Sequence, residues 1–399
     1  MFRQLSCFLL VCGYFLSSCS IDSDKIFNTK GPSSQKSDFG GLLFTTVTSD
    51  YAAGYLYNYD FESGEVTKIL SGQSGDPFVK VIGGKAYFFN RRPQNSNYRI
   101  FDTDSLHSSE AVLPEQTALP ALTTGAPQDM VFLPNGKWLL LANDVNFSSL
   151  KIFDPSTGLS EEVSADWDIQ GFRFSPSSFF EYHDKDGGHK IFVSHQGQTS
   201  EKEVENTSQQ IFELEYLASE GTVRVNDLDL DKPATQGIPL TFPNAKSFLY
   251  KESGEPLIIS TCYWRAGCQS GIERFDPESK SVKVVFRFKN RFLSTDFIEG
   301  ESDQKLIGAV YYDEKNYRNH VIERFDISNR TFLPIHRYLD ENSAGGIFHD
   351  ASTKTLYIGD MDLKEKKGTL EVYQDEQKIT TIEGIEGKPY NGSFYLRPN

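Results

Sequence analysis

The chain has 399 residues, a formal net charge of −15, 13% aromatic residues and 24% charged residues. No run of Lys and Arg could supply the counterion release that drives binding to a phosphate backbone, so the sequence argues against a nucleic-acid partner. A net negative charge of this size also helps to keep a protein soluble.

The first 18 residues, MFRQLSCFLLVCGYFLSS, have the order of a secretion signal, with Arg3 ahead of a short apolar run and small residues after it. The run is shorter than the roughly 20 apolar residues that span a bilayer. Leu16-Ser17-Ser18-Cys19 resembles the bacterial lipobox, which implies cleavage before Cys19 and a diacylglycerol on its thiol. An ordinary signal peptide followed by a chance cysteine is the alternative.

The residue after the lipobox cysteine bears on where the protein is sorted. In the proteobacterial pattern an Asp at this place retains a lipoprotein at the inner membrane, whereas this chain has Ser20. The resemblance therefore implies an anchor in the outer membrane, with the protein facing the periplasm or the cell surface. Residues 19–39 are polar and lack hydrophobic periodicity, so we expect a flexible tether spanning roughly 25 Å, followed by a folded domain over residues 40–399 that is a monomer.

Two cysteines remain in the folded domain, because Cys7 and Cys12 leave with the signal and Cys19 takes the lipid. Cys262 and Cys268 lie in CYWRAGC, and in an oxidising compartment we expect them to close a small loop. Such a disulfide adds about 2 kcal/mol by restricting the unfolded chain. A free thiol pair is the alternative, and a metal site would need further ligands that this stretch does not contain.

Seven segments of the domain end in the same way, typically in an apolar run followed by Phe-Asp and turn residues, as in LKIFDPSTG. They lie around Asp60, Asp102, Asp154, Glu213, Asp276, Asp326 and Gln374. In these endings Asp accepts backbone N–H groups, Pro presets φ and Gly takes a positive φ. An apolar hairpin precedes each ending, such as APQDMVFLPNGKWLLLAN, and a more polar strand follows.

Each repeat therefore predicts four antiparallel strands, which we name a to d, with a and b apolar and d the most polar. This gradient is typical of a β-propeller blade. GKPYNGSFYL at 387–396 has no partner after it, and GGLLFTTVTSD at 40–50 begins a blade that lacks strand a. Joining them predicts an all-β, seven-bladed propeller with no open sheet edge, although long third and fourth intervals leave six or eight blades as alternatives.

One repeat, LPNGKWLLLANDVNFSSLKIFDPSTG, resembles that of the bacterial YVTN-type propellers: a turn like Pro-Asp-Gly-Lys, a YVAN-like strand, and a VSVID-like strand that ends in Thr-Gly. IFVSHQG at 191–197 is a weaker copy. The resemblance covers one blade well and the others loosely, and it implies the fold rather than an activity. The chain lacks the tryptophan-bearing repeats of the outer-membrane assembly propeller lipoproteins, so a role in barrel assembly is not implied.

The connections differ between the two ends of the predicted blades. Turns from a to b and from c to d are minimal, whereas connections from b to c and from d to a are long and polar, including PEQTALPALTTGAPQ and DLDKPATQGIPLTFPN. Loop elaboration on one face favours a binding surface there. Around the pore mouth on that face we expect Arg91, Arg92, Asp129, Asn143, Asp144, His195, Trp264, Arg265, Asp296, Tyr312 and Asn391, within a wider polar set of Asn90, Gln128, Gln170, Asn244, Tyr263, Asp313 and Asp360.

Catalytic motifs are weak. There is no HExxH, and GQSGD at 72–76 lacks the final Gly of a nucleophile elbow. HDKDGGH at 183–189 has side chains that bind Ca²⁺ or Zn²⁺, but it coincides with an a–b turn and lacks the spacing of a calcium loop, which favours a hairpin. We expect no cofactor and no metal.

Three functions remain open at this point. We favour an outer-membrane-anchored lipoprotein whose propeller binds a protein, peptide or glycan on its loop-rich face, with Trp264 and Arg265 as the strongest contacts. The alternative is a pore-mouth enzyme, such as a lactonase-like or metal-assisted hydrolase, in which Asp129, Asp296 and His195 act as ligands or bases. The third is a passive envelope component whose polar pore residues only bind backbone and water.

Overall fold

A computed structural model describes most of the chain after residue 36, and all of these residues belong to one compact unit, Ser34–Asn399. The described ranges are 37–50, 52–74, 77–90, 97–107, 117–118, 126–143, 148–163, 176–184, 188–195, 210–225, 237–249, 255–261, 269–288, 292–302, 305–311, 320–338 and 345–397.

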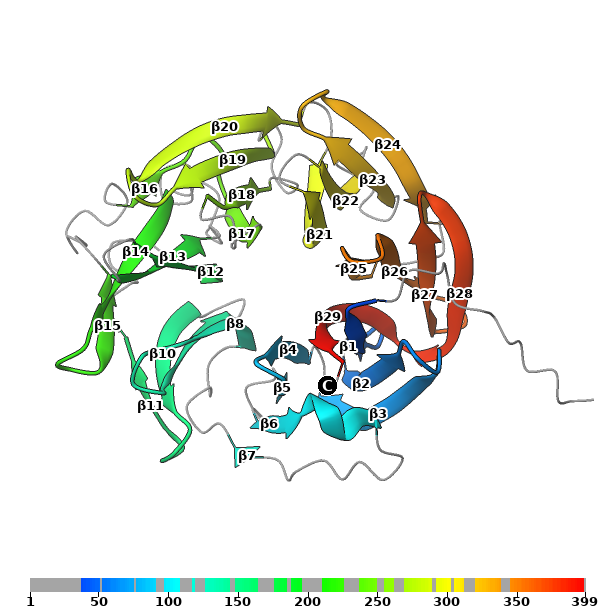
Figure 1. The fold of residues 1–399 in the computed structure, drawn as a ribbon, viewed down its shortest axis with the longest axis horizontal. Coiled ribbons are helices and arrows are strands. Elements are labelled where there is room, and N and C mark those ends of the chain that lie inside the picture. Colours follow the sequence, from blue (N-terminus) through cyan, green and yellow to red (C-terminus); the bar gives the residue numbers. More distant parts are fainter. Residues whose placement is uncertain are drawn as a thin grey trace, which may run out of the picture. The chain divides into compact units, whose positions relative to one another are not determined.

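The described residues form seven antiparallel sheets arranged in a ring (Figure 1), so the predicted seven-bladed propeller is confirmed. Blade 1 pairs β29 (Lys388–Leu396) with β1 (Phe39–Val47), β2 (Ala53–Asp60) and β3 (Val66–Ser74). Blade 2 contains β4 (Phe78–Ile82), β5 (Lys85–Asn90), β6 (Asn97–Asp102) and β7 (Thr117–Ala118). Blade 3 contains β8 (Ala126–Phe132), β9 (Trp138–Asn143), β10 (Ser148–Asp154) and β11 (Leu159–Glu162).

The remaining blades follow in chain order. Blade 4 contains β12 (Pro176–His183), β13 (His189–His195), β14 (Gln210–Leu217) and β15 (Thr222–Val225), with the short β16 (Ile238–Pro239) also paired to β14. Blade 5 contains β17 (Ala245–Leu249), β18 (Leu257–Ser260), β19 (Gly271–Asp276) and β20 (Ser281–Arg287). Blade 6 contains β21 (Phe292–Ser302), β22 (Lys305–Tyr311), β23 (His320–Asp326) and β24 (Thr331–Arg337). Blade 7 contains β25 (Ile347–Asp350), β26 (Thr355–Asp362), β27 (Lys367–Gln374) and β28 (Gln377–Glu386).

The two ends of the domain close the ring together, as predicted. β29 pairs antiparallel with β1 from Phe39 opposite Leu396 to Val47 opposite Lys388. The Tyr395 hydroxyl donates a 2.9 Å hydrogen bond to Asn58 Oδ1 on β2, and a Cβ at position 41 would lie 2.4 Å from that hydroxyl oxygen. Gly41 is therefore required at this point of closure.

The hydrophobic core is divided among the blade interfaces. Seven clusters of buried side chains each combine residues from two neighbouring blades, and together they cover all seven interfaces. Alternate side chains of a strand point to opposite faces of its sheet, so Leu42 and Phe44 pack toward blade 7 while Leu43 packs toward blade 2. This explains why strands a and b are apolar on both faces.

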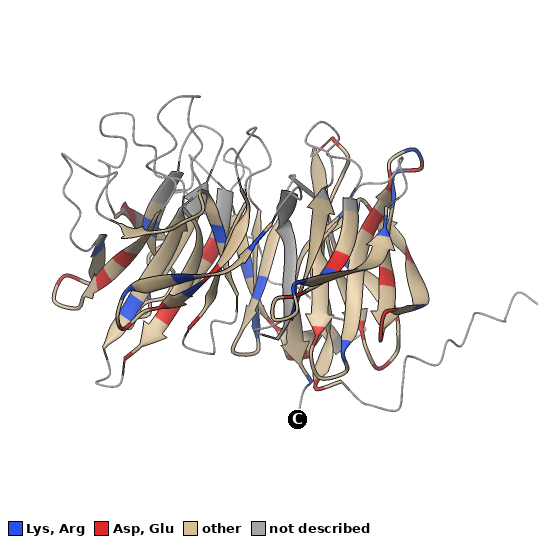
Figure 2. Ribbon diagram, turned by 90° about the horizontal axis from the view of Figure 1, so that it is seen from above, with Lys and Arg blue, Asp and Glu red and all other residues tan. Residues whose placement is uncertain are grey.

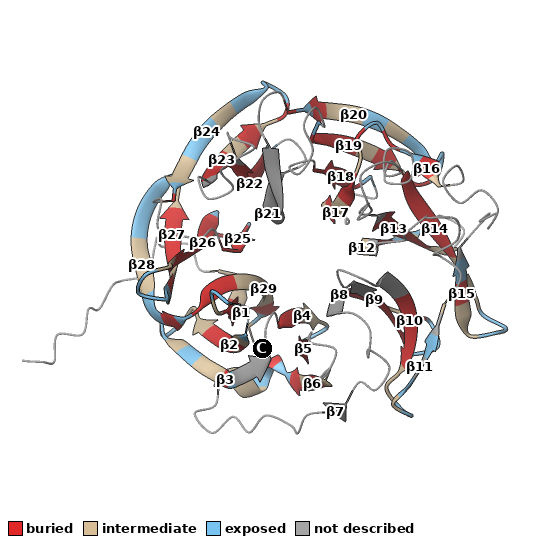
Figure 3. Cartoon of the chain, turned by 180° about the vertical axis from the view of Figure 1, so that it is seen from behind, coloured by how far each residue is buried: buried red, intermediate tan, exposed pale blue. Residues whose placement is uncertain are grey.

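Burial falls from the centre of the ring to its rim (Figure 3). Every residue of β26 except the last is buried, whereas β28 at the rim of the same blade is largely exposed or half-buried. The predicted gradient from strands a and b to strand d is confirmed, since strand d is the outermost strand of each sheet.

The predicted turn chemistry is also confirmed. Asp154 Oδ1 accepts the N–H of Ser156 at 2.9 Å, and Asp60 Oδ1 accepts those of Glu62 and Ser63. Gly158 closes its turn with φ of 71°. Arg330 occupies the corresponding left-handed position in blade 6 with φ of 55°, although it is not glycine.

Three predicted connections are wrong in detail. In blade 2 the c–d connection is not minimal, because it covers residues 103–116, begins with a 3₁₀ helix (Thr103–His107) and leads into β7. PEQTALPALTTGAPQ was expected to be a single d–a connection, but it contains β7 and the start of β8. DLDKPATQGIPLTFPN likewise contains β16, which pairs with β14. Pairings this short give no hydrophobic periodicity that a sequence could show.

Candidate functional site

The ring has two faces that differ in how the strands are joined. We call the face with the a–b and c–d turns the short-turn face; its described turns include residues 61–65, 83–84, 155–158, 277–280, 327–330 and 351–354. At the other, which we call the long-connection face, strands b and d end, and strands c and the next strands a begin. Among the intervals in the chain between these strand ends are 196–209, 226–244 and 261–270. In Figure 2 the short-turn face is the lower edge of the ring, where the C-terminus is marked.

The innermost strands surround the centre of the ring (Figure 1) and are β29, β4, β8, β12, β17, β21 and β25. Three predicted site residues belong to these strands: Asp129 to β8, Asp296 to β21 and Asn391 to β29. Asn143 and His195 are the last residues of β9 and β13, at the long-connection face, and Asn90 has the same place in β5. The last residues of strand b in blades 2, 3 and 4 therefore lie on the same face of the ring.

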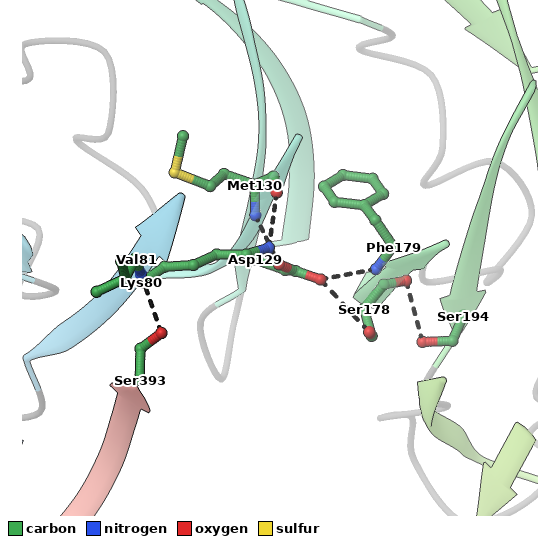
Figure 4. Close-up of polar contacts among 8 residues, drawn as sticks. All are labelled: Lys80, Val81, Asp129, Met130, Ser178, Phe179, Ser194 and Ser393. Carbon is green, nitrogen blue, oxygen red and sulfur yellow. Dashed lines mark hydrogen bonds and ion pairs between the residues drawn. The ribbon is translucent and has the colours of Figure 1, made fainter. Parts of the chain in front are cut away.

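Asp129 links three blades through its carboxylate (Figure 4). Oδ1 accepts hydrogen bonds from Lys80 Nζ at 2.6 Å and from the Met130 N–H at 2.9 Å. Oδ2 accepts the Phe179 N–H at 2.9 Å and lies 3.4 Å from the Ser178 hydroxyl. The side chain is only 11% exposed. Both oxygens therefore connect blade 3 to blades 2 and 4.

The polar contacts continue on both sides of Asp129 (Figure 4). Asn391 Oδ1 and Ser393 Oγ on β29 accept the N–H groups of Val79 and Val81 on β4, at 2.9 and 3.1 Å. On the other side, Ser194 Oγ lies 3.4 Å from the Ser178 carbonyl oxygen and 3.3 Å from that of Lys246 on β17. A series of side chain to backbone contacts thus joins blades 1 to 5 near the inner strands.

The other predicted site residues cannot be brought into this description. Arg91, Arg92, Asp144, Trp264, Arg265 and Tyr312 lie outside the described residues, as do Cys19, Cys262 and Cys268. For Asn143, His195 and Asp296 only the backbone is described. Asp296 lies at an irregularity of β21, between Ser294 and Ile298, where the pairing to β22 shifts.

HDKDGGH was interpreted as a hairpin, and β12 and β13 indeed form one around it. His183 and His189 lie opposite each other in register, with stacked rings whose centroids are 4.7 Å apart. His189 Nε2 is 3.3 Å from a Glu181 carboxylate oxygen. Among the described residues, no group of three or more His, Cys, Asp or Glu side chains could hold a metal ion.

Of a polar cluster between blades 6 and 7, the sequence analysis named only Asp360. His336 Nδ1 is 2.8 Å from the Tyr373 hydroxyl, and Nε2 is 3.8 Å from an Asp360 carboxylate oxygen. Burial, together with Glu371 and Asp360, raises the pKa of Tyr373 to about 12, so this phenol stays protonated at neutral pH. His336 has no sequence signal, because it lies in a strand d and meets its partners only across the blade interface.

A second missed feature is a buried glutamate in strand c. Glu273 and Glu323 lie three residues before the Asp that ends β19 and β23, and both are almost completely buried. The Glu273 carboxylate accepts the N–H groups of Thr241 and Phe242 at 2.8 and 3.3 Å, and it thereby holds the connection that leads into β17. Burial raises its pKa even so. The sequence ERFD occurs at both 273–276 and 323–326, so the repeat could have revealed this shared position of Glu within the two blades.

No protein-family model and no curated protein matches the sequence. The fold is similar to that of a quinonprotein alcohol dehydrogenase-like protein from Bacteroides thetaiotaomicron (TM-score 0.54, 12% identity, covering 90% of this chain and 79% of that one). It is also similar to a mutant of the Synechocystis apocarotenoid oxygenase (TM-score 0.52, 10% identity, 90% and 93%) and to a Lactobacillus plantarum protein (TM-score 0.51, 8% identity, 89% and 99%). At these identities the similarity concerns the fold alone.

Within the part of the chain that the structure describes, no helix has the length and apolar character needed to cross a membrane.

Proposed function

We propose that this protein is a lipoprotein of the outer membrane whose propeller binds a protein, peptide or glycan on its long-connection face. The observation that carries the proposal is the asymmetry between the two faces. One face has short turns, except for the connection 103–116 in blade 2, and the other joins its strands by longer connections such as 196–209 and 226–244, besides short ones such as the b–c turns of blades 1 and 7. Long connections on a rigid scaffold are where proteins commonly place binding residues. We assign the repeat to the YVTN type as part of the same proposal.

The closed ring supports a binding role because it holds the ends of strand b rigidly. Asn90, Asn143 and His195 end β5, β9 and β13 on this face, and Asp129 ties blades 2, 3 and 4 together beneath them. A partner that meets side chains on such a surface does not have to order the scaffold, which lowers the entropic cost of binding.

Capture of partners from envelope extracts tests the binding role. Replacing Trp264 and Arg265 together by Ala should lower recovery of the partner about tenfold or more, because buried Trp and Arg contacts dominate interface energies. The matched control is Arg397→Ala, since Arg397 follows β29 on the short-turn face. Equal recovery with the double variant and the control, at unchanged melting temperature, would reject this surface.

The lipid anchor has a separate test. Cys19→Ala removes the thiol that would carry the lipid, and the variant should move from the membrane fraction to the soluble fraction. If it stays with the outer membrane, the lipobox interpretation is wrong.

The pore-mouth hydrolase has less support. Both carboxylate oxygens of Asp129 are already engaged by Lys80, Met130, Phe179 and Ser178, so this residue could take a metal or a proton only by breaking contacts between blades. Metal analysis of the purified protein decides the matter: a tightly held divalent ion that is lost in Asp296→Ala would favour the enzyme.

A further inference from the structure

The N-terminal segment enters the ring on the short-turn face. β1 is the b strand of blade 1, and its first residue, Phe39, lies opposite Leu396, the last residue of β29. Strand b starts at the a–b end of a blade, which is the short-turn face. The direction of the chain in blade 1 therefore fixes the face from which the preceding residues leave.

Two residues ahead of β1 are held on that face by the neighbouring blade. The Ser37 hydroxyl donates a 2.6 Å hydrogen bond to Asp350 Oδ2, and the Asp38 N–H donates a 3.2 Å bond to the Ser352 hydroxyl. Asp350 is the last residue of β25, and Ser352 lies in the a–b turn of blade 7 that follows it. Asp350 is fully buried and also accepts the Ser352 and Thr353 hydroxyls, so the acceptor is itself held in place.

We infer that the anchored protein stands with its short-turn face toward the membrane and its long-connection face away from it. The inference rests on the proposed lipid anchor at Cys19. The long-connection face then meets a macromolecule from the aqueous compartment or from a facing surface, and not the headgroups of the membrane that holds the anchor.

The dimensions favour this orientation. The flexible tether that we expect from the sequence, which joins Cys19 to Ser37, would span roughly 25 Å. Strands of six to eight residues make the ring about 20 to 25 Å thick. Turning the long-connection face to the membrane would require the tether to pass the whole thickness of the ring as well as the headgroup region, and stretching a coil well beyond its average span costs conformational entropy.

Energy transfer from the protein to labelled lipid tests the orientation. Two sites of the same residue type lie on neighbouring blades: Glu62 in the c–d turn of blade 1 on the short-turn face, and Glu365 in the b–c turn of blade 7 on the long-connection face. Both are exposed. An azide-bearing residue at either position takes a donor dye without disturbing the native cysteines. The lipidated protein is placed in vesicles of phosphatidylethanolamine and phosphatidylglycerol that carry an acceptor lipid.

We expect transfer at least about twofold more efficient from position 62 than from position 365, because the two faces differ in distance to the membrane by about the ring thickness. Sedimentation with the vesicles, measured on the same samples, reports the anchor independently. Sedimentation with equal or reversed transfer would overturn the orientation and leave the anchor standing. Failure to sediment would overturn both, and Cys19→Ala provides the reference for that outcome.

Discussion

The aspartates in the turns and Asp129 in an inner strand both accept hydrogen bonds through their carboxylates, but their partners lie at different distances along the chain. Asp154 Oδ1 accepts the N–H and the hydroxyl of Ser156, both within its own turn. Asp129 accepts from residues about 50 positions away on two other blades. A turn aspartate shapes one hairpin, whereas Asp129 holds separate sheets together. Replacing them by Ala should therefore lower the stability of the protein by different amounts.

The largest effect is expected from Asp129→Ala. The change leaves the buried Phe179 and Met130 N–H groups without an acceptor and Lys80 without its carboxylate, which should lower the free energy of unfolding by about 3 kcal/mol. Urea unfolding measures the loss. Asp129→Asn keeps one acceptor oxygen, so its free energy of unfolding should lie between those of the wild type and Asp129→Ala. A loss no greater than that of Asp154→Ala would contradict the comparison.

Asp350 accepts hydrogen bonds both from its own turn and from Ser37, which is far away in the chain. Its contribution to stability should therefore depend on pH in the acid range. Burial alone would raise its pKa, but hydrogen bonds from Ser352, Ser37 and Thr353 together bring the pKa below its ordinary value of 3.8. A carboxyl whose pKa is lowered by folding stabilises the protein above its unfolded pKa, and this contribution is lost as the pH falls through the folded value.

The measurement for Asp350 is the free energy of unfolding of the wild type and of Asp350→Asn across the acid range. The difference between the two proteins should be constant at mildly acidic pH and should shrink below a pH of about 4. A difference that keeps its full size to the lowest pH would show that the Asp350 carboxylate contributes nothing to stability.

Asp154→Ala should have a smaller effect, because water can reach the exposed turn and replace the lost acceptor. We expect a modest drop in melting temperature with no change in the neighbouring blades. Hydrogen exchange would localise the effect to residues 154–159. Protection lost across the β8 and β12 interface instead would mean that the turn supports the ring and not only its hairpin.

The smallest effect is a gain. Arg330 has a left-handed backbone with φ of 55°, a conformation that is strained for a residue with a side chain. Glycine, which occupies the corresponding position 158 in blade 3, has no such strain. Arg330→Gly removes that strain but raises the conformational entropy of the unfolded chain, which opposes the gain. The net stabilisation should be about 0.5 kcal/mol. Gly158→Ala is the converse variant and should destabilise. A loss of stability in Arg330→Gly would show that its side chain makes a contact worth more than the strain.

Particular segments show why the blades could be predicted and the site only partly. GIERFDPESK and LKIFDPSTG carry their strand period and their turn residues within ten positions, so the sequence predicts the hairpins directly. Asp129 was predicted as a site residue, but nothing near it reveals Lys80 and Phe179 as its partners. Those contacts exist only because blades 2 and 4 are brought against blade 3.

The sequence by itself determined the seven repeats, their turns and the closing partnership of residues 40–50 with 387–396, because short-range hydrogen bonds and alternating burial leave a local pattern in the chain. Only the tertiary structure decided which polar groups bind across the interfaces: Asp129 to two blades, His336 to Tyr373 and Asp360, and Ser37 to Asp350. These contacts join residues far apart in the chain, and their geometry depends on how neighbouring sheets pack, which no single repeat contains.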